Sequence, residues 1–221
     1  MPRMARLVAV NYPYHITQRG NNRSAVFFED QDRQFYLQTL KKYSSLWGLE
    51  IWAYCLMPNH VHVLGVPRNP ESLAKGIGGT NLLYTQYVNR HYARSGRLWQ
   101  NRFFSNIIEK ESYLWAVARY IERNPVRAGL VKFPEDYPWS SAAAHLLGEQ
   151  DKVLSGEAWL DELEVQAYRN FLQSEDAPAE TIIRKAARTD RPLGTEMFVK
   201  GLEMILGRDI VIRKRGRPRK K

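Results

Sequence analysis

The sequence of 221 residues lacks the features of a membrane protein and of a disulfide scaffold. No apolar run reaches the roughly 18 residues that a membrane-spanning helix needs, and the first residues do not form the apolar stretch of a signal peptide. The only cysteine, Cys55, stands in an apolar run and has no second cysteine for an internal disulfide. These absences predict a cytoplasmic protein without a membrane span, in which Cys55 is structural.

Acidic side chains are scarce relative to basic ones. The chain has 33 lysines and arginines against 23 aspartates and glutamates, which gives a net charge of +10. Seven of the basic residues stand in the last nine positions, 213–221, which contain no acid, so the rest of the chain carries only +3. The net charge indicates a polyanionic partner, but most of it lies in the tail, which is also compatible with a solvated, disordered terminus, and the body is only mildly basic.

The pattern of apolar residues and breakers predicts an α+β fold. We expect strands at 6–18, 49–56, 60–66 and 103–108, and helices at 30–48, 72–94 and 111–124, with the last helix stopped by Pro125. This order favours an antiparallel sheet with helices packed mainly on one face. Further helices are expected at 140–147, 162–173, 179–187 and 195–206. The predicted organisation is a main domain at 1–147, a helical appendage at 148–207 and a basic tail at 208–221.

Two histidines follow the short turn at 57–59. His60 and His62 are two residues apart on a predicted strand, so both side chains project from the same face while Val61 and Val63 point to the other. Two imidazoles placed in this way can bind one metal ion. A pair of ordinary half-buried histidines is the alternative reading of the same pattern.

The predicted helix that ends at Pro125 offers an oxygen ligand and a nucleophile. Tyr120 and Asn124 are four residues apart and share a face about 100° from the centre of the apolar stripe. A phenol and an amide one turn apart could therefore reach a metal held by His60 and His62. Considered separately, Tyr120 is also compatible with a packing tyrosine and Asn124 with a residue that completes a helix end.

Four segments resemble one known family. Residues 12–23 (YPYHITQRGNNR), 57–64 (MPNHVHVL), 96–103 (GRLWQNRF) and 120–130 (YIERNPVRAGL) resemble the HUH single-tyrosine transposases, and most closely the REP-associated tyrosine transposases of bacteria. The resemblance implies that His60 and His62 bind Mg²⁺ or Mn²⁺ with Asn124 as third ligand. It also implies that Tyr120 attacks single-stranded DNA and forms a 5′-phosphotyrosine. Many insertion-sequence relatives have glutamine, which has a longer side chain, where Asn124 stands. Imidazoles also accept Zn²⁺, so the choice of Mg²⁺ or Mn²⁺ rests on the family.

The same reaction requires an unpaired strand, so we expect hairpin DNA with single-stranded flanks as partner. Candidate DNA contacts are basic, amide or aromatic residues in the predicted loops, and each is also compatible with a solvated loop position or a core tryptophan. They are Arg19, Asn21, Asn22, Arg23, Arg94, Arg97, Trp99, Arg102 and Arg127. In the tail, Arg215 and Arg217 flank a glycine in a segment that resembles a minor-groove AT-hook.

Other functions fit parts of the sequence. A non-catalytic DNA-binding protein derived from a transposase, and a relaxase or replication initiator with the same chemistry, are the nearest alternatives. A metal phosphoesterase is disfavoured because no Asp-His pair follows His62. The glycines at 76, 78 and 79 lack the Gly-Lys-Ser/Thr ending of a phosphate-binding loop, so no nucleotide cofactor is expected. The sequence leaves a monomer and a homodimer open.

Overall fold

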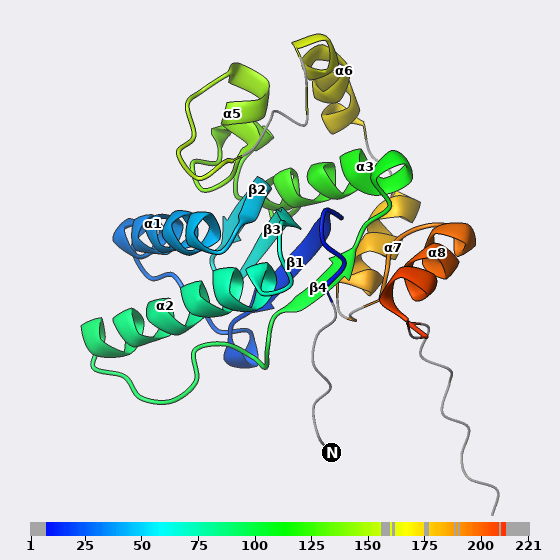
Figure 1. Ribbon diagram of the computed structural model, residues 1–221. Coiled ribbons are helices and arrows are strands. Elements are labelled where there is room, and N and C mark those ends of the chain that lie inside the picture. The colour runs from blue at the N-terminus through cyan, green and yellow to red at the C-terminus, as the bar shows by residue number, and fades with distance from the viewer. Residues whose placement is uncertain are drawn as a thin grey trace, which may run out of the picture.

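The computed structural model describes residues 8–210 apart from 156–159, 161, 175–176, 188, 190 and 208. At its centre lies a four-stranded antiparallel sheet in the order β2-β3-β1-β4 (Figure 1). Its strands are β1 (Tyr14–Arg19), β2 (Leu49–Met57), β3 (His60–Pro67) and β4 (Phe104–Ile107). The α+β class and the antiparallel sheet are therefore confirmed.

The strands lie close to the predicted positions, with one shorter than expected. The hairpin of β2 and β3 pairs Met57 with His60 across the short turn. Strand β1 begins only at Tyr14, because Pro13 has no N–H for the ladder and Asn11 adopts a left-handed backbone with φ of 67°. Residues 8–13, which belong to the predicted strand 6–18, form a loop.

One face of the sheet is covered by α1 (Asp30–Leu46) and α2 (Gly78–His91) (Figure 1). Helix α1 begins with a capping box, in which the carboxylate of Asp32 accepts the backbone N–H of the N-cap residue Glu29 at 3.1 Å and that of Phe28 at 2.7 Å. A π-helical turn, η2 (Ser72–Ile77), precedes α2, so the glycine-rich start of the predicted helix is irregular. Val61 and Val63 of β3 point into this core.

The other face is covered by α3 (Lys110–Glu122), with which α6 (Glu162–Gln173) and α7 (Ala177–Ala186) pack. The expectation of helices mainly on one face is therefore wrong. An extra residue in β2, Trp52, makes a β-bulge between Ile51 and Ala53 that shifts the alternation of side chains. Beyond this bulge β2 also presents apolar residues to the α3 face, so both faces need a cover.

Pro125 does not simply stop the predicted helix 111–124. Helix α3 ends at Glu122, and a four-residue helix, α4 (Asn124–Arg127), follows with Pro125 in its first turn. Proline is accepted there because the first N–H groups of a helix have no partner within the helix. The break places Asn124 at the start of a new turn, next to the end of α3.

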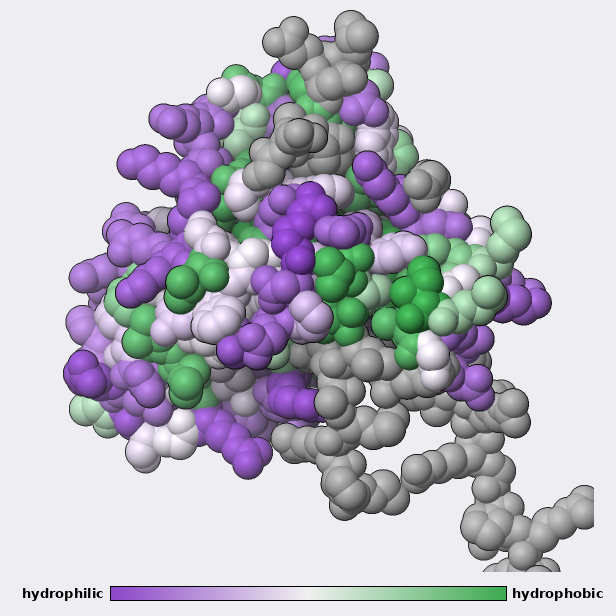
Figure 2. All heavy atoms as spheres, in the orientation of Figure 1, coloured by the Kyte–Doolittle hydropathy of each residue, from purple (hydrophilic) through white to green (hydrophobic). Residues whose placement is uncertain are grey.

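The C-terminal helices lie close to the predicted ranges. They are α5 (Ala142–Leu147), α6, α7 and α8 (Glu196–Leu206), and short 3-10 turns η1 (Asn21–Arg23) and η3 (Pro134–Asp136) complete the elements. Thr195 caps α8 by accepting the backbone N–H of Phe198 at 3.2 Å. On the face shown in Figure 2, apolar residues gather over α8, where Met197, Met204 and Ile205 are exposed. Among the residues that the structure describes, no helix has the length and apolar character of a membrane span.

Candidate active site

Strand β3 presents His60 and His62 to the face covered by α3. It lies between β2 and β1, where His62 stands opposite Thr17 and His60 opposite Arg19. Residues directly opposite one another in an antiparallel pair point to the same side, so β1 and β3 together form the floor of one site. His62 is buried and His60 half-buried, whereas Val61 and Val63 belong to the opposite core. The predicted geometry of the pair is thus confirmed.

Hydrogen bonds fix the rings of both histidines through the same nitrogen. Nδ1 of His60 lies 2.6 Å from Oδ1 of Asn59, and Nδ1 of His62 lies 2.9 Å from Nε2 of His15. The amide oxygen can only accept, so Nδ1 of His60 donates and its Nε2 keeps the lone pair that a metal would use. The pair with His15 permits the same tautomer of His62.

Burial keeps these three histidines neutral at neutral pH. Desolvation, followed by the charges of Arg19 and Arg127, lowers the pKa of His60 to about 4. Burial and then Arg127 lower the pKa of His15 to about 3, and burial with the neighbouring histidines holds the pKa of His62 well below its usual value. Neutral imidazoles have the free electron pair that metal binding requires.

Tyr120 and Asn124 meet the histidines from the helical side. The ring of Tyr120, near the end of α3, lies 5.6 Å from that of His62 and 5.8 Å from that of His15, measured between centroids. Nδ2 of Asn124 lies 3.5 Å from Nε2 of His60. Turning this amide over would place its oxygen there, because the two orientations of an asparagine amide have nearly the same shape. The four residues therefore converge around one point.

Arg127 holds the ring of Tyr120 from the side of α4. Its guanidinium carbon lies 4.1 Å from the centroid of that ring, and Nη2 donates to the backbone oxygen of Tyr120 at 3.2 Å. Nη1 also pairs with Glu180 of α7 at 3.4 Å. Arg127 is thus part of the support of Tyr120, and the predicted contact of Arg127 with DNA stays a prediction.

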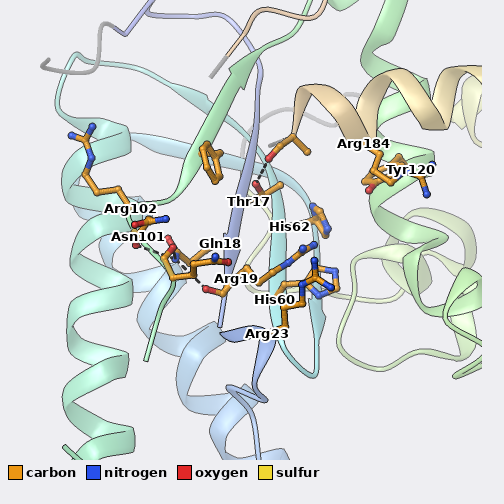
Figure 3. A pocket seen from close by; sticks show the side chains of 13 residues that line it. Thr17, Gln18, Arg19, Arg23, His60, His62, Asn101, Arg102, Tyr120 and Arg184 are labelled. Carbon is orange, nitrogen blue, oxygen red and sulfur yellow. Dashed lines mark hydrogen bonds between the residues drawn. The ribbon is translucent and has the colours of Figure 1, made fainter. Parts of the chain in front are cut away.

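A cavity of about 270 Å³ opens beside Tyr120, His60 and His62 (Figure 3). Its described lining contains four arginines and no aspartate or glutamate; the arginines are Arg19, Arg23, Arg102 and Arg184. Three of these arginines were expected as DNA contacts. A cavity that is lined by positively charged side chains and no acidic ones favours an anion such as a phosphodiester.

The remaining predicted DNA contacts lie outside this cavity. Asn21 and Asn22 are exposed in η1, and Arg94 and Arg97 are exposed after α2. Trp99 is buried, and its indole N–H donates to the backbone oxygen of Asn81 at 3.3 Å. The structure therefore assigns Trp99 to the core instead of to base stacking. Arg215 and Arg217 lie outside the described residues.

Sequence reasoning missed His15 and Arg184. The alternation of His15 and Thr17 on a predicted strand could have indicated that they share a face, but not which strand lies beside them. Arg184 stands 64 positions after Tyr120, and only the packing of α7 brings it to the cavity. No pattern within the sequence would have shown this neighbour.

The sequence is similar to those of known proteins. A family model described as "Transposase IS200 like" matches residues 8–124. A Haemophilus influenzae protein named as a REP-associated tyrosine transposase is 26% identical over 148 residues, which cover 59% of this chain and 84% of that protein.

Two solved structures are also similar. A REP-associated tyrosine transposase bound to a REP hairpin matches with a TM-score of 0.53 and 20% identity, over 73% of this chain and 96% of the other. A protein of Deinococcus radiodurans described as a transposase gives a TM-score of 0.38 and 19% identity, over 55% and 97%. The first of these likenesses shows the same fold.

Proposed function

The chain belongs to the family of IS200-like transposases, and from this we propose that it cleaves and rejoins single-stranded DNA beside hairpin repeats, with Tyr120 as nucleophile. The observation that carries the proposal is the convergence of Tyr120, His60 and His62 at a cavity lined by arginines, with Asn124 beside His60. The REP hairpin bound to the similar solved transposase supports hairpin DNA as the substrate. A chromosomal substrate of this kind would place the activity in the bacterial cytoplasm.

The proposed reaction has two transesterification steps. In cleavage, the phenol oxygen of Tyr120 attacks a phosphorus of the DNA, the bond from phosphorus to O3′ breaks, and the phenol proton passes through water to the leaving oxygen. The products are a 5′-phosphotyrosine and a free 3′-hydroxyl. In rejoining, another 3′-hydroxyl attacks the phosphotyrosine and releases Tyr120. Each step exchanges one phosphoester for another, so no nucleotide cofactor is consumed.

The residues around Tyr120 fit a divalent cation, which we propose to be Mg²⁺ or Mn²⁺. Two neutral imidazoles with outward Nε2 atoms and one amide provide nitrogen and oxygen donors. Asn124, whose amide lies 3.5 Å from Nε2 of His60, is proposed as the third ligand. An ion held by His60, His62 and Asn124 would polarise the scissile phosphate and stabilise the charge that develops on it.

The other residues of the cavity would hold the strand. Arg19, Arg23 and Arg102 line it with Tyr120 and would bind phosphates, which fixes the position of the backbone without reading its sequence. Arg127 keeps the phenol ring in place through its contact at 4.1 Å.

We also propose that the basic tail adds electrostatic affinity for DNA. Because all four central residues come from one chain, we propose that a monomer is sufficient for cleavage.

A covalent-adduct assay tests the proposal. The protein is incubated with labelled hairpin oligonucleotides that have single-stranded flanks, in the presence of Mn²⁺, and resolved on a denaturing gel. The wild type should give a DNA adduct that survives denaturation. Tyr120→Phe should give none, because it removes the attacking oxygen and keeps the ring.

A matched control is Tyr113→Phe, which removes the same oxygen from another tyrosine of α3, outside the cavity lining. This variant should form the adduct as the wild type does. Equal adduct from Tyr120→Phe and the wild type would overturn the assignment of the nucleophile. DNA binding by the wild type without any adduct in an oligonucleotide library would instead support the non-catalytic DNA-binding alternative.

A further inference from the structure

Helix α7 lies against the catalytic face, although it belongs to a part of the chain beyond the matched residues 8–124. Its residue Ile183 is buried in the same core as α3, and Glu180 pairs with Arg127 at 3.4 Å. At the end of the helix, Thr17 of β1 donates its hydroxyl to the backbone oxygen of Ala187 at 3.0 Å. Helix α7 is therefore held both by the helix that carries Tyr120 and by the strand opposite His62.

A second anchor fixes the segment that follows α7. The side-chain amide of Asn106, in β4, donates to the backbone oxygen of Ala186 at 2.9 Å and to that of Arg191 at 2.7 Å. A buried asparagine that satisfies the carbonyls at a helix end fixes the position of that end. The orientation of α7 relative to the sheet is thus determined by polar contacts at both of its ends.

This orientation directs Arg184 into the catalytic cavity. Arg184 lines the cavity together with Tyr120 and His62, and Figure 3 shows it on the Tyr120 side, coming from α7. Lys185, the next residue, is also exposed but does not line the cavity, because consecutive residues of a helix point about 100° apart. Two adjacent cations of one helix therefore face different surroundings.

Arg184 has no anion of its own in the described part of the chain. No ion pair or hydrogen bond joins its guanidinium to a described residue, and the carboxylate one turn earlier, Glu180, pairs with Arg127. The cavity lining adds three more arginines and no acid. Such a concentration of positive charge is stabilised when an anion enters, and a guanidinium suits a phosphate because its N–H groups match two phosphate oxygens.

We propose that α7 forms one wall of the DNA-binding cleft and that Arg184 binds a backbone phosphate of the strand on which Tyr120 acts. This inference rests on the proposed function, since that function brings a phosphodiester to the cavity. It gives the helical appendage a direct part in holding the substrate. Arg184 thus joins Arg19, Arg23 and Arg102 around the strand, from the Tyr120 side of the cavity (Figure 3).

The experiment compares Arg184→Gln with Lys185→Gln, both combined with Tyr120→Phe so that binding is measured without cleavage. The two substitutions remove the same charge from neighbouring exposed positions of α7, so a general electrostatic effect would be equal in both. The affinity for a hairpin oligonucleotide with single-stranded flanks is measured by fluorescence anisotropy at several salt concentrations.

Arg184→Gln should weaken binding about tenfold or more, as expected when a charged hydrogen bond is lost. The slope of log K against log salt should become shallower by about 0.7, the value for one phosphate contact on a single strand. Lys185→Gln should leave the affinity and the salt slope close to those of the parent, which is the protein with Tyr120→Phe alone. Equal effects of the two variants would overturn the assignment of Arg184.

Neutral methylphosphonate linkages, placed one at a time along the flank, locate the phosphate. At the contacted position the modified DNA should bind the parent more weakly, and Arg184→Gln should then cause no further loss. If Arg184→Gln instead strengthens binding and accelerates cleavage in the Tyr120 protein, α7 is an obstructing lid and the proposed wall is wrong. Adduct formation by the wild type, measured in parallel, reports on the proposed function alone.

Discussion

The helix that carries the nucleophile is anchored by a buried carboxylate, and this anchor can be tested by removing one oxygen atom. Glu122, two residues after Tyr120, is fully buried. Its Oε1 lies 2.6 Å from the Ser141 hydroxyl and 2.6 Å from Nδ1 of His145, and its Oε2 accepts the hydroxyl of Tyr168 at 2.9 Å. The carboxylate thus joins α3 to the segment that starts α5 and to α6. Tyr168→Phe would remove one of its three partners.

The magnitude follows from the burial of both groups. Glu122 and Tyr168 are each 0% exposed, so water cannot replace the lost hydroxyl without a rearrangement. A hydrogen bond to a charged group contributes about 1.5–3 kcal/mol to the free energy of unfolding. At about 2–4 °C per kcal/mol for a chain of this size, Tyr168→Phe should lower the Tm by about 3–12 °C.

The assay is urea unfolding followed by circular dichroism, with Tyr113→Phe as control. No hydrogen bond joins the Tyr113 hydroxyl to the described part of the chain, so its removal should change the free energy of unfolding by less than about 0.5 kcal/mol. A double-mutant cycle with Glu122→Gln should show a coupling of about 1 kcal/mol or more between the two positions. If Tyr168→Phe is no more destabilising than Tyr113→Phe, the hydroxyl does not support the carboxylate and the reasoning fails.

Three further predictions concern the site. His15→Phe should weaken Mn²⁺ binding, measured by calorimetry, about 10–100-fold, because it removes the hydrogen-bonding partner of His62 Nδ1; unchanged affinity would exclude this positioning role. Asn124→Leu should weaken Mn²⁺ binding more than Asn124→Gln, which keeps an amide oxygen; equal losses would remove Asn124 from the ligand set. In the metal-free protein, the free energy of unfolding should fall as the pH drops from about 6.5 towards 4, because these histidines become protonated in the unfolded chain at a higher pH than in the folded protein. A free energy of unfolding that does not change over this pH range in the presence of a chelator would contradict this.

The local patterns of the sequence were sufficient to predict the main parts of the site. The alternation of a strand placed His60 and His62 on one face, and this placement is confirmed. It succeeded because the period of a single element fixes which side chains share a face. The helical repeat placed Tyr120 and Asn124 on one face of a single helix, whereas α3 ends at Glu122 and Asn124 begins α4, although both residues lie beside the histidines. The resemblance to a family then indicated that the two faces meet.

The features that sequence reasoning missed depend on the pairing and packing of distant segments. The contact of His15 with His62 follows from the register of β1 against β3, which no single strand determines. The bulge at Trp52 changes the alternation within β2 and therefore the faces that need helices. Arg184 reaches the cavity because Asn106 and Thr17 bind the end of α7, and these contacts join residues far apart in the chain.

The most direct test of the central claim is to identify the residue that becomes linked to DNA. The wild-type adduct is digested with nuclease and trypsin and examined by mass spectrometry. Cleavage after Arg119 and Arg123 releases a peptide of residues 120–123, YIER, in which Tyr120 carries the only hydroxyl. The account predicts a nucleotide attached to this peptide. Attachment to any other peptide, such as the one that contains Tyr113, would contradict the assignment of Tyr120 as the nucleophile.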